Sequence, residues 1–174
     1  MIKDFARGTT FVFIDASNIY HSFNTLGWKI DFMRMKEYFA RNITLGNLYF
    51  YTAYDPEYVQ QRKFLDFLEI IGYIVRKKRV KFIRDEHAAG GGFHKGNLDV
   101  ELTIDAVDNV EKFQTFVLCS GDSDFEALLK YMREHRKNCI VVSTRDHVSV
   151  ELLRQAKFID LKKIRDEIEL GRVK

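Results

Sequence analysis

The stretch Leu118-Cys119-Ser120-Gly121-Asp122-Ser123-Asp124-Phe125 marks the transition on which the predicted fold depends. Its apolar start continues a run typical of a buried parallel strand, and the amphipathic pattern after it is typical of a helix. Gly121 permits a tight turn between the two elements, and acidic side chains are favoured where a helix begins. Asp122 and Asp124 are therefore predicted to lie just beyond the carboxyl end of a strand. A plainer interpretation is that one aspartate caps the helix and the other is solvated.

Segments with strand-like and helix-like patterns alternate along the chain. The strand-like segments are residues 9–14, 48–54, 73–76, 115–119, 139–142 and 158–161. The helix-like segments are residues 19–23, 32–41, 57–71, 97–107, 125–132, 148–153 and 162–169. We therefore predict an open, mainly parallel, three-layer α/β sheet of five to six strands, with the core order 3-2-1-4-5.

Two neighbouring segments fit this alternation less simply. Residues 80–83 are predicted to form an added edge strand, and residues 85–96, which contain three consecutive glycines, resemble a loop. The helix predicted over residues 97–107 has apolar side chains around most of its surface, so we expect it to be largely buried. Asp99 and Asp105 are acidic exceptions within this helix, and such exceptions require a reason.

The composition favours a single domain over residues 1–174. A chain of this length with 46% hydrophobic residues can bury one core. No apolar run approaches the roughly 20 residues of a spanning helix, and the first residues form no secretory leader, so we expect a cytoplasmic protein without a membrane partner. The two cysteines, Cys119 and Cys139, are expected to be buried thiols rather than a disulfide or a zinc site.

The charge distribution contains one candidate surface for nucleic acid. The formal net charge is only +3, so a polyanion would have to be met by a local patch. In the segment Arg76-Lys77-Lys78-Arg79-Val80-Lys81, five of six residues are basic. Lysines that protect a solvated edge strand would give the same pattern.

Acidic residues follow two of the predicted strands. Asp15 comes directly after the first strand, and Asp122 and Asp124 follow the fourth. In an open α/β sheet ligands bind beyond the carboxyl ends of the central strands, so these side chains are predicted to converge if the two strands are neighbours. Asp99, on the helix after the glycine-rich segment, is placed to complete the group. Carboxylates about 4 Å apart repel by roughly 4 kcal/mol per pair at an effective dielectric constant of 20, so such a group must bind a cation, take up protons or stay apart.

The donor atoms of this acidic group indicate its chemistry. Carboxylate oxygens favour a hard cation such as Mg²⁺ or Mn²⁺. The sequence contains neither a Ser-His-Asp or Cys-His arrangement nor a Walker lysine loop. Hard metals held by carboxylates suit hydrolysis of a phosphodiester, because the metal activates water and neutralises charge on the phosphate.

Three segments together resemble the signature segments of the NYN-domain family, which is related to the PIN-like nucleases. They are Phe13-Ile14-Asp15-Ala16-Ser17-Asn18, then Lys95-Gly96-Asn97-Leu98-Asp99-Val100-Glu101-Leu102 with Asp105, then Ser120-Gly121-Asp122-Ser123-Asp124-Phe125. The resemblance covers residues 10–160. It implies a PIN-like (Rossmannoid) α/β sheet, an acidic Mg²⁺ or Mn²⁺ site and, as in characterised relatives, ribonuclease activity.

The same resemblance implies roles for individual residues. The catalytic metal ligands would be Asp15, Asp99, Asp122 and Asp124. Asn18 would orient the site or the phosphate, and Ser120 would donate a hydrogen bond from behind the ligands. Alternatively, Asn18 caps a helix and Ser120 closes a turn. Asp105 lies six residues after the ligand on its helix, about 240° around the axis, so we expect it to act as support rather than as a neighbouring ligand.

We therefore expect a metal-dependent ribonuclease that hydrolyses single-stranded RNA. The residues expected to contact RNA are Arg76, Lys77, Lys78, Arg79, Lys81 and Lys95. The main alternative is a non-catalytic RNA-binding or regulatory module with the same fold, and a further one is a small-molecule phosphohydrolase. The sequence leaves the number of subunits open, a homo-oligomer included.

Overall fold

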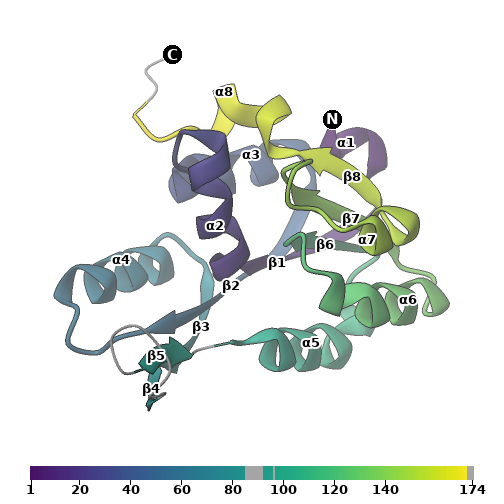
Figure 1. Cartoon of the computed structure of the whole chain (residues 1–174). Coiled ribbons are helices and arrows are strands. Elements are labelled where there is room, and N and C mark those ends of the chain that lie inside the picture. The colour runs from purple at the N-terminus through teal and green to yellow at the C-terminus, as the bar shows by residue number, and fades with distance from the viewer. Residues whose placement is uncertain (85–91, 96, 172–174) are drawn as a thin grey trace.

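The computed structural model describes residues 1–84, 92–95 and 97–171, and a six-stranded parallel sheet forms its centre (Figure 1). The strands are β1 (Thr9–Asp15), β2 (Thr44–Tyr54), β3 (Ile74–Arg79), β6 (Thr115–Cys119), β7 (Asn138–Ser143) and β8 (Lys157–Asp160). They lie in the order β3-β2-β1-β6-β7-β8, and every neighbouring pair is parallel. Counted along the chain this order is 3-2-1-4-5-6, so the predicted topology is confirmed.

Helices cover both faces of the sheet and complete three layers (Figure 1). The helices on one face are α1 (Ile2–Phe5), α2 (Ala16–Leu26), α3 (Phe32–Asn42), α4 (Val59–Ile70) and α8 (Arg165–Ile168). The helices on the other face are α5 (Asp99–Asp108), α6 (Glu126–Glu134) and α7 (Val150–Gln155). The short 3₁₀ helices are η1 (Val110–Lys112), η2 (Ser123–Phe125) and η3 (Leu161–Ile164). Within the described part of the chain, none of the helices has the length and apolar composition that crossing a bilayer requires.

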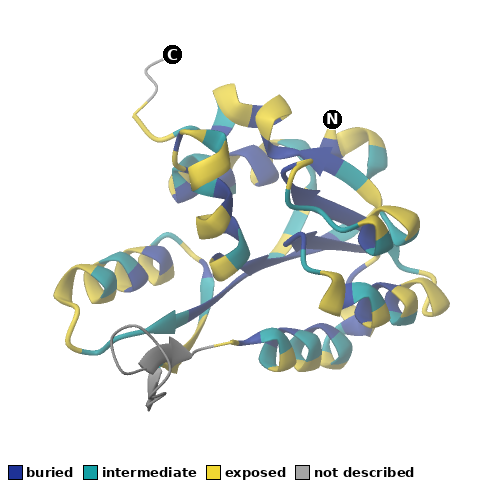
Figure 2. Ribbon diagram, viewed as in Figure 1, coloured by how far each residue is buried: buried dark blue, intermediate teal, exposed yellow. Residues whose placement is uncertain are grey.

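Strand β1 divides the core into two apolar clusters. Its side chains alternate, with Val12 and Ile14 in the cluster under α2 and α3, and Phe11 and Phe13 in the cluster under α5 and α6. All residues of β6 are buried, and so are those of β1 after Thr9 (Figure 2). The Phe13 ring stacks on Tyr49 with centroids 4.9 Å apart. Because helices cover both faces of the sheet, the sequence of β1 is a continuous apolar run and does not alternate between apolar and polar residues.

Polar side chains set where the helices begin. Asp31 caps α3 as expected, accepting two backbone N–H groups at 2.9 and 3.2 Å. Helix α2 starts earlier than predicted, because Asp15 caps it directly at the end of β1. Helix α4 starts later than predicted, at Val59, because Asp55 accepts the Glu57 N–H at 3.0 Å and forms a turn before the helix.

The segment between β3 and α5 differs from its prediction. The expected edge strand at 80–83 is β4 (Lys81–Arg84), which pairs antiparallel with β5 (Gly92–Lys95) in a separate two-stranded sheet. The predicted loop over 85–96 is therefore wrong for β5, and residues 85–91 and 96 lie outside the described residues. Glycine-rich sequence carries no strand periodicity, so the local pattern gives no signal for β5.

The prediction that the helix at 97–107 is largely buried is wrong. In α5, Val100 is 68% exposed and Ile104 is 53% exposed, whereas Leu102 and Ala106 are buried against the sheet. Helix α5 forms the outer layer on its face, and a surface helix needs only one apolar stripe.

Both cysteines are free and buried, as predicted. Burial raises the pKa of the Cys119 thiol, so it is neutral at physiological pH. Cys119 ends β6 and belongs to the apolar core, which gives it a packing role.

Candidate metal centre

Three of the four predicted ligands lie together where the start of α5 meets the turn after β6. One carboxylate oxygen from each of Asp99, Asp122 and Asp124 lies within 4.8 Å of the other two. Asp99 is the first residue of α5, and Asp122 caps η2 by accepting the Asp124 N–H at 3.0 Å. Three carboxylates at this spacing, on the partly exposed edge of the sheet, are a donor set that fits a hard divalent cation. We refer to these three residues as the acidic cluster.

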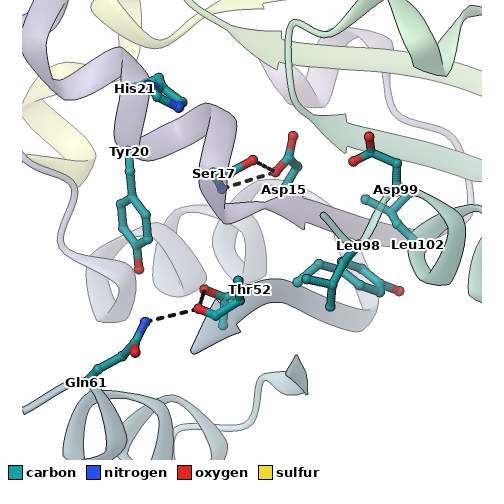
Figure 3. A pocket seen from close by; sticks show the side chains of 11 residues that line it. Asp15, Ser17, Tyr20, His21, Thr52, Gln61, Leu98, Asp99 and Leu102 are labelled. Atoms are coloured by element: carbon teal, nitrogen blue, oxygen red, sulfur yellow. Dashed lines mark hydrogen bonds between the residues drawn. The ribbon is translucent and has the colours of Figure 1, made fainter. Parts of the chain in front are cut away.

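Asp15, the fourth predicted ligand, is 7% exposed, lies beside Asp99 (Figure 3) and is held by several hydrogen bonds. One of its oxygens accepts the Ser17 hydroxyl at 2.7 Å and the backbone N–H groups of Ser17 and Asn18 at 3.1 and 3.3 Å. The other oxygen accepts the Ser120 hydroxyl at 3.0 Å. Asp15 therefore caps α2, where the helix N-terminus favours its charge. It is also close enough for its charge to raise the pKa of Asp99.

The electrostatics of Asp99 show that the cluster is self-repulsive. Burial is the largest cause that raises its pKa above the usual value, and a hydrogen bond from the Asn97 side chain at 2.6 Å opposes this rise. The charges of Asp15, Asp122 and Asp124 raise the pKa of Asp99 further. A bound divalent cation would remove this repulsion, because it favours the ionised carboxylates.

We expect Mg²⁺ or Mn²⁺ to raise the melting temperature of the wild type and not that of Asp122→Asn. A ligand at 100 times its Kd stabilises the folded state by about 2.7 kcal/mol. Without metal the variant should be at least as stable as the wild type, because asparagine still accepts the Asp124 N–H while one repelling charge is gone. Thermal unfolding with and without chelator measures both effects.

The same comparison has a predicted pH dependence. A carboxyl group whose pKa is raised in the folded state destabilises it increasingly as pH rises through that pKa. The raised pKa of Asp99 therefore predicts that the metal-free advantage of Asp122→Asn shrinks as the pH is lowered. Equal responses of both proteins to the ions would contradict the assignment of Asp122 as a ligand.

A network of hydrogen bonds joins the end of β1 to the turn that carries the cluster. The buried Ser120 hydroxyl donates to Asp15 at 3.0 Å and accepts the Asp122 N–H at 3.2 Å. The side-chain oxygen of Asn18 accepts the Gly121 N–H at 2.9 Å. Ser120 and Asn18, two of the predicted supporting residues, thus position the turn that carries Asp122, a predicted ligand.

Ser120→Ala is expected to lower metal affinity and RNA cleavage by roughly 10- to 100-fold, as loss of a partner behind a metal ligand commonly does. The matched control is Ser143→Ala, because the Ser143 hydroxyl is equally buried and has no hydrogen-bond partner among the described residues. Initial rates at varied Mn²⁺ concentration measure the difference. Equal rates in the two variants would show that Ser120 only fills space.

Asp105 is not part of the acidic cluster and instead ties α5 to the sheet. It accepts the Tyr51 hydroxyl at 2.9 Å and forms an ion pair with the Arg76 Nε at 2.8 Å. Lys78 pairs with Glu101, also on α5, at 2.7 Å. Two cations predicted to contact RNA therefore hold the helix that begins with Asp99, a predicted ligand.

The remaining basic residues of the predicted patch have varied surroundings. Lys77 pairs with Glu69 at 3.3 Å, and Arg79 is exposed at the end of β3. Lys81 and Lys95 are register partners in the β4–β5 hairpin. The Lys77–Glu69 pair joins exposed side chains, and such pairs contribute only about 0–1 kcal/mol, so a phosphate can compete for Lys77. Contact with RNA stays a prediction for this patch.

A cavity of about 360 Å³ lies beside Asp15 and Asp99 (Figure 3), and the sequence did not reveal it. Its walls come from α2, the end of β2, α4 and the start of α5. Ser17, Tyr20 and His21 line it from α2 at spacings of three and four residues, which place side chains on one helix face. This spacing is the sequence signal for the cavity wall. The helix predicted from the sequence begins only at residue 19, so it leaves out Ser17 and the spacing is not apparent.

The fold and the acidic cluster together define a class of protein. It is a three-layer parallel α/β protein with acidic residues beyond the carboxyl ends of its central strands. The chain belongs to the NYN-domain family, because the family model described as NYN domain matches residues 9–162. The resemblance seen in the sequence motifs is thereby confirmed. The family is nuclease-like and generally metal-dependent.

The proteins similar to this chain include a sequence relative and a solved structure. It is 39% identical over 162 residues to the low amplitude and bright protein LabA of Synechococcus elongatus, an alignment that covers 91% of this chain and 86% of that protein. A crystal structure of a protein of unknown function from Vibrio parahaemolyticus matches with a TM-score of 0.76 and 22% identity. That match covers 94% of this chain and 97% of the other, and it shows a shared fold.

Proposed function

We propose that this protein is a metal-dependent ribonuclease that hydrolyses phosphodiester bonds of single-stranded RNA. The observation that carries the proposal is the acidic cluster, in which Asp99, Asp122 and Asp124 offer oxygens within 4.8 Å of one another. Membership of a nuclease-like family supports the reaction class. A cluster of three carboxylates without a metal would repel an RNA phosphate, so the cation is a necessary part of the proposal.

The residues of the acidic cluster would hold Mg²⁺ or Mn²⁺. When bound there, such an ion would activate water and neutralise charge on the phosphate. Asp15 caps α2 and accepts the Ser120 hydroxyl, and Ser120 in turn accepts the Asp122 N–H, so Asp15 helps to fix the turn on which Asp122 lies. Arg76 and Lys78 hold α5 and so orient Asp99. Arg79 and the hairpin residues Lys81 and Lys95 are the proposed contacts for the RNA backbone.

The test is cleavage of an end-labelled single-stranded RNA in the presence of Mn²⁺, Mg²⁺ or chelator. We expect cleavage with either ion, none with chelator, and a severe loss in Asp15→Asn and Asp122→Asn. Equal cleavage by the wild type and both variants would identify a contaminating nuclease. RNA binding without turnover under any divalent ion would favour the non-catalytic module, and turnover of nucleotides but not of RNA would favour a small-molecule phosphohydrolase.

A further inference from the structure

The cavity beside the acidic cluster has the size and position of a ligand site. Its volume of about 360 Å³ lies within the range of roughly 300–1,000 Å³ that is common for small-molecule pockets. Asp15 and Asp99 line one side, and Asp99 is also a member of the cluster, so the cavity and the proposed metal site are contiguous. A ligand in the cavity would therefore lie directly beside the acidic cluster.

The polar groups of the cavity disfavour an anion and include several hydrogen-bond acceptors. No lysine or arginine is among the described residues that line it, whereas two carboxylates, Asp15 and Asp99, are, so a phosphate is disfavoured there. The Thr52 hydroxyl and the Gln61 side chain both donate to the Ala53 carbonyl, at 3.0 and 3.1 Å. The Ser17 hydroxyl donates to Asp15 at 2.7 Å. With their hydrogens engaged, the hydroxyl oxygens of Ser17 and Thr52 remain acceptors.

The shape of the cavity suits a flat, partly apolar group. Tyr20 projects from α2 toward Thr52 and Gln61, and its side chain is 37% exposed (Figure 3). Leu98 lies across the cavity from this ring (Figure 3). An aromatic ring facing an apolar side chain, with hydrogen-bond acceptors between them, is the combination with which proteins bind unstacked nucleobases.

We propose that this cavity binds one unpaired nucleoside of the RNA, stacked on Tyr20, and so places the adjoining phosphate at the acidic cluster; this inference rests on the proposed function. A base in a duplex is stacked and paired, and it would have to leave the helix to enter. Binding of a base in this cavity therefore favours single-stranded over double-stranded RNA as the substrate. The Tyr51 side chain at the cavity wall is fixed by its hydrogen bond to Asp105, so the site is formed before RNA arrives.

The test is equilibrium binding of a short fluorescent RNA and of an abasic strand of the same length, in Ca²⁺, which carboxylates also bind. Loss of one stacking contact corresponds to about a 5- to 150-fold change in affinity. We expect Tyr20→Ala to weaken binding of the RNA by this factor and to leave binding of the abasic strand unchanged. Tyr20→Phe keeps the ring and should bind as the wild type does. The matched control is Tyr58→Ala, since Tyr58 is a more exposed tyrosine outside the cavity, at 56%.

Equal weakening of both strands by Tyr20→Ala, or weakening of neither, would overturn the inference. So would an equal loss in the Tyr58→Ala control. The ribonuclease proposal fails on a different result. It is wrong if no RNA cleavage both requires a divalent ion and is lost in Asp122→Asn. Because the binding measurement requires no turnover, the nucleoside site is tested whichever way the cleavage experiment ends.

Discussion

Replacement of Asp122 by asparagine is expected to lower metal-dependent cleavage of RNA by more than about a hundredfold, the upper end of what loss of a partner behind a metal ligand costs. Asp122 supplies an oxygen to the acidic cluster and lies on the turn that Ser120 holds. An amide oxygen carries no charge and binds a hard cation less well than a carboxylate does. The fold should persist, because asparagine can still accept the Asp124 N–H.

The matched control for this prediction is Asp108→Asn. Asp108 is the exposed last residue of α5, the same helix that begins with Asp99, and it is not a member of the acidic cluster. Its neutralisation changes the net charge by the same amount, so a general effect of charge on RNA binding would appear in both variants. Rates measured under single-turnover conditions separate the chemical step from binding. Similar rates for Asp122→Asn and Asp108→Asn would exclude Asp122 from the metal site.

Gly121→Ala is expected to destabilise the protein by about 1–3 kcal/mol, the usual cost of inserting a methyl group into a filled space. A Cβ atom at this position would lie 2.2 Å from the carbonyl oxygen of His147, a backbone atom that cannot rotate away. The Gly121 carbonyl also accepts the Ser149 N–H at 2.9 Å, so the turn is held against the loop after β7. Relief of the contact must move the turn, and with it Asp122, so metal binding should weaken as well.

Chemical denaturation measures this loss, and Gly27→Ala serves as the comparison. Gly27 has a left-handed φ of +71° but no atom within 4 Å of the added methyl group. Its substitution therefore carries only the conformational cost, about 1–2 kcal/mol for a left-handed residue. If Gly121→Ala retained both wild-type stability and wild-type affinity for Mn²⁺, the close packing of the turn on His147 would not be required for the site.

Local sequence patterns were sufficient to predict most strands of the sheet and the acidic residues that follow them. The continuous apolar runs of β1 and β6 predicted buried parallel strands, and Asp31 predicted the start of α3. The same patterns failed for β5, because a glycine-rich segment has no strand periodicity. They also failed for the exposed side of α5, because local periodicity does not show that a helix lies in the outer layer.

The sequence by itself determined which elements form, in what order, and that acidic residues follow the first and fourth strands of the sheet, because periodicity and residue type act over a few neighbouring positions. Only the tertiary structure decided that Asp99, Asp122 and Asp124 meet within 4.8 Å, while Asp15 turns to α2 and to a serine 105 residues away. It also decided that Arg76 and Lys78 pair with α5, and that Tyr20 faces a cavity. Distances between remote segments depend on how the layers pack, and no short stretch of sequence contains that information.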